Sequence, residues 1–133
     1  MVAIVIGGVL LSAVVVVFGW LVGPLNWWRK NRRLLQLIRK RREFILVYNP
    51  VTGASKTVVF LDGGQIGDGM NDHEHTWQVR RGALEFLAAD GKLWNRFKLD
   101  QAGGRLVDTA DLDVRSLYGQ YLFPQHQELS RSK

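Results

Sequence analysis

The chain contains no cysteine, and it has only three histidines among its 133 residues. Without thiolates, the protein has no disulfides, iron–sulfur clusters, thiolate zinc sites or cysteine nucleophiles. A metal site built from the remaining residue types needs three or four convergent ligands, and the histidines are too few and too scattered to supply them. The sequence therefore predicts no metal site and no cofactor.

Ionisable side chains are absent from residues 2–22, which are almost entirely apolar. At 1.5 Å per residue, a helix of this length matches the roughly 30 Å hydrocarbon core of a bilayer. A cleaved signal peptide is the alternative, but it needs a basic segment before the apolar run and a small-residue cleavage site after it, and neither is present. We therefore expect a transmembrane helix over residues 1–23.

Positive charge is concentrated in one short segment. Eight of the 18 Lys and Arg residues lie in residues 29–42, which contain no acidic residue, and the rest of the chain has 10 basic and 12 acidic side chains. This distribution argues against a nucleic-acid-binding surface. Since Lys and Arg are retained on the cytoplasmic side, we expect a single-pass protein of the bacterial inner membrane, with its N-terminus outside and its C-terminal domain in the cytoplasm.

Residues 24–42 are predicted to form a juxtamembrane amphipathic helix that binds anionic lipids. Leucine and isoleucine share one side of the helical wheel and basic residues cover the other, while indole rings favour the membrane interface. A simpler alternative is that the charges serve only as a topology signal. The residues expected to contact the membrane interface are Trp20, Trp27, Trp28, Arg29, Lys30, Arg32, Arg33, Leu34, Leu35, Ile38, Arg39, Lys40, Arg41 and Arg42.

Small residues recur four positions apart within the predicted transmembrane helix, a spacing that allows a second helix to approach closely. We therefore expect partner transmembrane proteins in a hetero-complex. The residues predicted to pack against a partner helix are Gly7, Gly8, Ser12, Gly19 and Gly23.

Residues 43–124 are predicted to form a small cytoplasmic β-domain, followed by a loose tail over 125–133. Short runs rich in aromatic and β-branched residues alternate with turn sequences that contain glycine, asparagine or aspartate. Such short connections favour an antiparallel meander that forms a barrel or sandwich. The expected strands are 44–48, 57–61, 76–80, 84–88, 94–99 and 105–108, with a seventh within 114–122.

The densest polar cluster in this domain is the sequence NDHEH over residues 71–75. We expect His73, Glu74, His75 and Trp77 to line the mouth of a ligand site if one exists, although a solvated loop is the simpler interpretation. The glycine-rich segment 62–72 carries aspartates and precedes a strand, which argues against a phosphate-binding loop. No nucleophile motif is present, so no catalytic residue is predicted.

Residues 71–100 resemble a small bacterial β-domain found with glycosyltransferase-like and sulfotransferase-like proteins of Gram-negative bacteria. This resemblance implies an auxiliary, non-catalytic domain in the bacterial envelope and carries no catalytic residues. The matching positions are Asn71, Glu74, Trp77, Leu84, Phe86, Gly91, Arg96 and Phe97.

Together these patterns predict a membrane-anchored all-β protein that is not an enzyme. The first functional hypothesis is an accessory or scaffold subunit whose β-domain docks on or stabilises a respiratory, photosynthetic or polysaccharide-related membrane complex. The alternative is a membrane-tethered binding module for a small ligand or a lipid-linked sugar head group. A third, enzymatic hypothesis would require hydrolysis by the histidines or aspartates of the β-domain.

Overall fold

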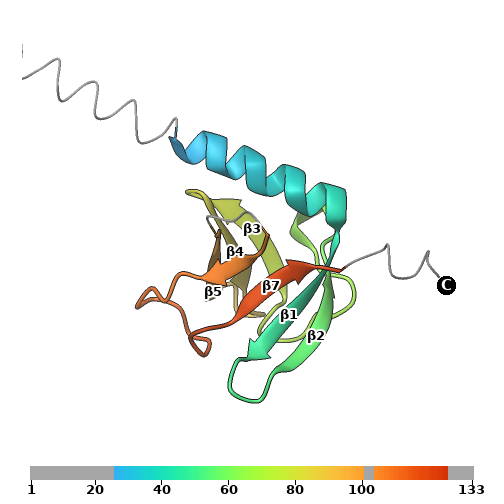
Figure 1. Cartoon of the computed structure of the whole chain (residues 1–133), viewed down its shortest axis with the longest axis vertical. Coiled ribbons are helices and arrows are strands. Elements are labelled where there is room, and N and C mark those ends of the chain that lie inside the picture. Colours follow the sequence, from blue (N-terminus) through green and yellow to red (C-terminus); the bar gives the residue numbers. More distant parts are fainter. Residues whose placement is uncertain (1–25, 101–103, 126–133) are drawn as a thin grey trace, which may run out of the picture.

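The structure, a computed structural model, describes residues 26–100 and 104–125. This part of the chain contains a helix over residues 26–41, seven strands and a short 3-10 helix (Figure 1). The strands are β1 (Glu43–Asn49), β2 (Ala54–Val59), β3 (Thr76–Arg80), β4 (Ala83–Leu87), β5 (Leu93–Leu99), β6 (Leu106–Asp108) and β7 (Tyr121–Pro124), and the 3-10 helix η1 is Asp62–Gly64. Each predicted strand overlaps one of these seven.

The predicted antiparallel pairing is confirmed in every strand pair of the sheet. The β3–β4 hairpin shows how the sequence enforces it. Arg81 and Gly82 form the connection, with φ angles of 53° and 78° respectively. Positive φ at both central positions is the signature of a type I′ turn, whose twist matches that of the flanking strands.

The predicted sequential order of the strands is wrong. The sheet has the order β2-β1-β7-β6-β5-β4-β3, so the last strand lies between the first strand and the sixth. Leu122 of β7 pairs with Leu46 of β1 on one side and with Leu106 of β6 on the other. All three leucines are fully buried, and the apolar contact they share favours this insertion over a place for β7 at the edge.

The sheet curves into a half-barrel rather than a closed meander or a sandwich. Register shifts in the β1–β2 and β4–β5 pairings bend the strands locally. The chain after β2 then runs between the two edge strands: Phe60 makes an isolated bridge to Ile66, and Gln65 makes another to Thr76. These bridges partly cover the edges of β2 and β3.

Aromatic rings fill the interior of the half-barrel. The Phe60 ring lies at the centre, with centroid distances of 5.3 Å to Phe44, 5.4 Å to Trp77 and 5.8 Å to Phe86. Phe86 in turn meets Phe97 edge to face at 5.6 Å. Alternation along β4 and β5 places Phe86 and Phe97 on the concave face, where both are fully buried.

The helix covers one end of this core. Leu34 and Ile38, one turn apart on the helix, are each only 1% exposed and belong to the same apolar cluster as the phenylalanines. Arg42 ends the helix with a φ of 59°, and its carbonyl accepts a hydrogen bond of 2.9 Å from the Phe60 amide. The helix is thereby fixed where β1 begins and β2 ends (Figure 1).

This packing corrects the predicted fold class. The apolar side of the helix, which we expected to lie against lipid, contacts the protein's own core through Leu34 and Ile38, with Leu35 partly buried beside them. In the part of the chain that the structure describes, no helix has the length and apolar character needed to cross a membrane. The fold is a half-barrel with one packed helix, and a membrane-anchored all-β fold is not what the structure shows.

Several predicted residues lie outside the described residues. These are the predicted spanning segment 1–23, the interface residue Trp20 and the predicted helix-packing residues Gly7, Gly8, Ser12, Gly19 and Gly23. The basic residues of the helix are described, and Arg29, Lys30, Arg32, Arg33, Arg39, Lys40, Arg41 and Arg42 are all exposed. Trp27 and Trp28 are 44% and 58% exposed.

Because Ile38 fills the end of the core, Ile38→Ala is expected to lower the free energy of unfolding of the full chain by about 2–5 kcal/mol. Gln36→Ala, on the exposed side of the same helix, is the matched control and is expected to change it by less than about 0.5 kcal/mol. Urea denaturation followed by tryptophan fluorescence measures both. Equal stability of the two variants would mean that the helix does not contribute to the core.

Candidate functional site

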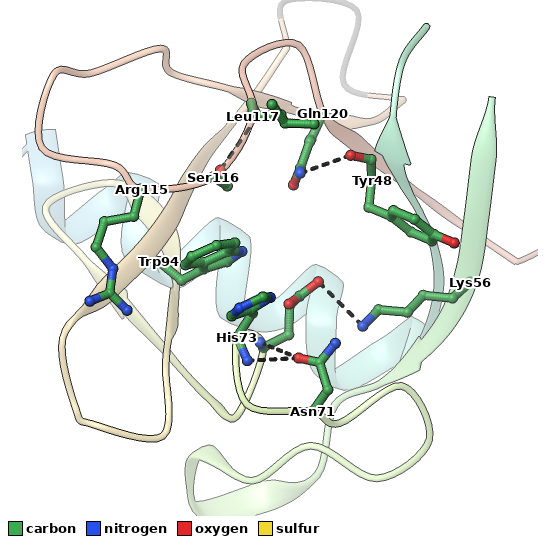
Figure 2. Close-up of a pocket in the computed structure, with 10 residues that line it drawn as sticks. Tyr48, Lys56, Asn71, His73, Trp94, Arg115, Ser116, Leu117 and Gln120 are labelled. Carbon is green, nitrogen blue, oxygen red and sulfur yellow. Dashed lines mark hydrogen bonds and ion pairs between the residues drawn. The ribbon is translucent and has the colours of Figure 1, made fainter. Parts of the chain in front are cut away.

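A pocket of about 640 Å³ opens at the end of the half-barrel opposite the helix (Figure 2). Its position follows from the strand directions: the pocket is lined where β1 ends and where β2, β5 and β7 begin, whereas the helix leads into the start of β1. The lining residues are Tyr48, Lys56, Asn71, His73, Glu74, Trp94, Arg115, Ser116, Leu117 and Gln120.

Glu74 is the buried charge of this pocket, with a side chain only 5% exposed. Its Oε1 atom lies 3.3 Å from Nζ of Lys56, which also donates a 2.9 Å hydrogen bond to the carbonyl of Gly69. The second carboxylate oxygen, Oε2, is buried and has no hydrogen-bond partner among the described residues. A buried carboxylate oxygen without a hydrogen-bond donor lowers the stability of the fold, so a ligand that donates a hydrogen bond to this oxygen is bound favourably.

An asparagine turn holds Glu74 in place. The Asn71 side-chain oxygen accepts hydrogen bonds of 2.8 Å from the amide of His73 and 2.7 Å from the amide of Glu74. Asparagine favours such turns because its short side chain reaches the backbone two or three residues further on. The turn directs both side chains from this loop toward the pocket.

One wall of the pocket is aromatic. The His73 ring stacks on Trp94 with centroids 3.9 Å apart and planes within 6° of parallel (Figure 2). The Arg115 guanidinium lies 5.6 Å from the centroid of the same indole ring, and it also pairs with Asp90 at 3.1 Å. The indole is therefore held by a flat ring and by a cation.

The opposite part of the lining is held by a buried amide pair. Gln120 donates to the carbonyl of Tyr48 at 2.9 Å, and its side-chain oxygen accepts a 2.9 Å hydrogen bond from Asn95. Asn95 is fully buried and Gln120 is 6% exposed, so both amides need these partners. This network ties the residue before β7 to β1 and β5 at the wall of the pocket.

The predicted ligand residues divide between two places. His73 and Glu74 line the pocket. Trp77 lies in the core, where its indole N–H reaches the carbonyls of Leu61 at 3.0 Å and Gln65 at 2.8 Å. His75 does not belong to the lining, and its backbone amide bonds to Leu87. Among the described residues, no three His, Asp or Glu side chains converge as metal ligands would.

A second charged cluster lies on the outer face of β3, β4 and β5. Glu85 has a side chain 3% exposed, and Arg96 lies directly across from it in register and binds it at 2.9 Å. Gln78 donates to the other Glu85 oxygen at 2.7 Å. Arg96 also pairs with Asp111 at 2.8 Å and with Asp113 at 2.9 Å. The charge of Arg96 is therefore neutralised by three carboxylates on this face.

This cluster shifts the ionisation of its members. The hydrogen bonds from Arg96 hold the pKa of Asp113 below its ordinary value of 3.8. The same guanidinium, aided by the Thr109 hydroxyl, lowers the pKa of Asp111. In return, Asp113 first, with Asp111 and Glu85, raises the pKa of Arg96. These aspartates act as ion-pair partners of Arg96 and do not belong to the lining of the pocket around Glu74.

Most of the pocket was not predicted from the sequence. Lys56 lies in a strand and matches no motif, and Ser116 and Gln120 come from an irregular segment before β7. The sequence gives one indication for Gln120. A glutamine directly before a central strand is expected to be buried, and its amide then needs a hydrogen-bond partner. The partner, Asn95, is 25 residues away in sequence, and only the fold brings the two together.

Comparison of the chain with protein-family models, with curated proteins and with solved structures finds no match.

Acid is expected to destabilise the protein through Asp111 and Asp113. Because their pKa values are lowered in the folded state, their contribution is present above the ordinary value of 3.8 and is lost as the pH falls through the lowered values. Urea denaturation between about pH 5 and pH 2 is expected to show a shallower loss of stability in Asp111→Asn/Asp113→Asn than in the wild type. Asp68→Asn, outside the cluster, serves as the control. A double variant that follows the wild-type slope would exclude the cluster as the cause.

Proposed function

We propose that the protein is a non-catalytic binding module whose half-barrel takes a small polar ligand of the sugar type in the pocket around Glu74. The observation that carries this proposal is the pairing of a buried acceptor with a flat aromatic wall. Glu74 supplies an oxygen without a hydrogen-bond partner among the described residues, and the stacked rings of His73 and Trp94 supply the wall. Sugars combine hydroxyl donors with apolar ring faces, so both features find a counterpart on one ligand.

The polar groups of the lining come from separate elements and face one cavity. Lys56, Glu74 and Gln120 arise from β2, from the loop before β3 and from the segment before β7. Such convergence of a few polar groups in a partly apolar cavity is typical of small-molecule sites, and the volume of about 640 Å³ lies within the usual range for them. The sugar head group of a lipid-linked carrier fits the same description.

Catalysis is not part of the proposal. A serine nucleophile needs a base within hydrogen-bond reach, but the Ser116 hydroxyl donates to the carbonyl of Leu117 at 3.4 Å. No hydrogen bond joins Ser116 to His73 in the part of the chain that the structure describes, and the His73 ring is stacked on Trp94. These contacts support a pocket that binds a molecule over one that activates a serine nucleophile.

The test is a binding screen of the full chain against monosaccharides, amino sugars and short oligosaccharides, followed by calorimetry on the tightest. Trp94→Leu is expected to weaken binding by up to about tenfold, because the His73 ring loses the indole that it stacks on and the aromatic wall is no longer held in place. Glu74→Gln is expected to weaken it by at least about tenfold through loss of a charged acceptor.

Trp28→Leu is the matched control, since this indole is 58% exposed on the helix, away from the pocket. It is expected to leave the affinity unchanged. A sugar that binds all four proteins equally would bind elsewhere, and the absence of binding by any sugar would contradict the proposal.

A second proposal is the accessory subunit of a bacterial inner-membrane complex, of respiratory, photosynthetic or polysaccharide-related type. It is supported by apolar side chains exposed beside the pocket mouth, where Leu117 is 62% and Tyr118 is 52% exposed. Next to them, Gly119 lies against Pro50 of the β1–β2 turn, where Val51 is 92% exposed. Apolar side chains gathered in this way are typical of protein-binding surfaces. The exposed basic side chains and indoles of the helix support a location at the membrane surface.

A pull-down in mild detergent tests this second proposal. The wild-type chain is expected to recover membrane proteins that Leu117→Ser/Tyr118→Ser loses, because the substitutions remove the apolar contact. Leu112→Ser is the control, since Leu112 is 94% exposed in an earlier turn of the same β6–β7 connection. Recovery of the same proteins by all three chains, or of none by the wild type, would contradict docking through this surface.

A further inference from the structure

A second cavity, of about 290 Å³, lies where the helix meets the β3–β4 turn and the end of β5. It is separate from the pocket around Glu74 and lies at the helix end of the half-barrel. Its lining has an apolar part formed by Leu34 and Leu99 and a cationic part formed by Lys30, Arg33 and Lys98. The three cations come from two elements that are far apart in sequence, so the fold and not a run of basic residues brings them together.

The helix packs closely against the β3–β4 turn beside this cavity. Asn31 accepts a hydrogen bond from the Gly82 amide through its side-chain oxygen. A Cβ on Gly82 would lie 3.0 Å from Cδ and 3.1 Å from Cβ of Lys30, so a larger residue here would displace the lysine stem. The Arg81 guanidinium of the same turn lies 5.7 Å from the centroid of the Trp27 ring on the helix. These contacts hold Lys30 beside the cavity before any ligand arrives.

The charge of the cavity is unbalanced. Lys30, Arg33 and Lys98 form no ion pair with any carboxylate of the described residues. Asp100 also lines the cavity, but its carboxylate pairs with Arg105 at 3.5 Å and accepts a 3.2 Å hydrogen bond from the Gly104 amide. Three cations thus face one carboxylate that already has partners, and this excess favours an anion.

We propose that this cavity binds a phosphate group, with Lys30, Arg33 and Lys98 as its cationic ligands. Arg33 provides the planar fork that suits phosphate oxygens, and the two lysines add mobile point charges. The apolar part of the lining suits the organic portion of a phosphate ester. A lipid head group and a soluble phosphate share this chemistry, and the two sources are separated by experiment.

The full chain, labelled with ¹⁵N and purified in an uncharged detergent, is titrated in two arms while the Gly82 amide resonance is followed. One arm adds inorganic phosphate. The other mixes phosphatidylglycerol into the micelles, with phosphatidylcholine as the zwitterionic control. Saturation with inorganic phosphate alone supports a soluble ligand, and saturation with phosphatidylglycerol alone supports a lipid head group. Saturation in both arms supports recognition of the phosphate group that the two ligands share. No saturation in either arm would overturn the proposal.

Variants then distinguish a site from general attraction to the basic helix. Lys98→Gln is expected to weaken binding about fivefold, because a cation near an anionic group loses that much on removal, and Lys98→Arg is expected to restore it. Lys40→Gln removes the same charge from an exposed position outside the cavity and is expected to change the affinity less than twofold. Equal effects of Lys98→Gln and Lys40→Gln would mean diffuse charge and no site. Neither result bears on sugar binding around Glu74.

Discussion

The contact of Leu34 and Ile38 with the phenylalanine core is the interaction on which both ends of the half-barrel depend. A curved open sheet exposes its concave face at two ends, and this helix removes one of them from water. The polar pocket consequently lies at the other end, with the aromatic core between it and the helix. The same contact turns the basic side of the helix outward and brings Lys30 and Arg33 beside Lys98. The packing of Leu34 and Ile38 on the core therefore sets the positions of two chemically different cavities.

The two buried glutamates differ in how completely their carboxylates are paired. Glu85 is fully provided with partners, since Arg96, Arg80 and Gln78 surround its carboxylate. Glu74 has Lys56 on one oxygen and no partner on the other among the described residues. A satisfied carboxylate stabilises the outer face of the sheet, whereas an incompletely satisfied one in a cavity is a feature of binding sites. This contrast supports the proposal that the pocket around Glu74 binds a ligand while the Glu85 cluster stabilises the sheet.

Local patterns in the sequence predicted the strands well but not their neighbours. Alternation of apolar residues and glycine-containing turns located 76–80 and 84–88 to within one residue, because these signals are local. The place of β7 depends on Leu122 meeting Leu46 and Leu106, which no local pattern encodes. The amphipathic pattern of the helix was recognised, but periodicity does not distinguish a face packed on lipid from one packed on protein. In the pocket, His73 and Glu74 belonged to a visible polar cluster, whereas Lys56 and Gln120 reach the cavity only through tertiary structure.

The position of β7 has a consequence for the order of events during synthesis. The β1–β2 hairpin and the strands from β3 to β6 are made first, yet the ladder between them runs through β7, whose residues are Tyr121–Pro124. During synthesis the sheet therefore emerges in two parts, each of which can pair internally, and their ladders join only once β7 has been made. During that interval the facing edges of β1 and β6 are open to other strands.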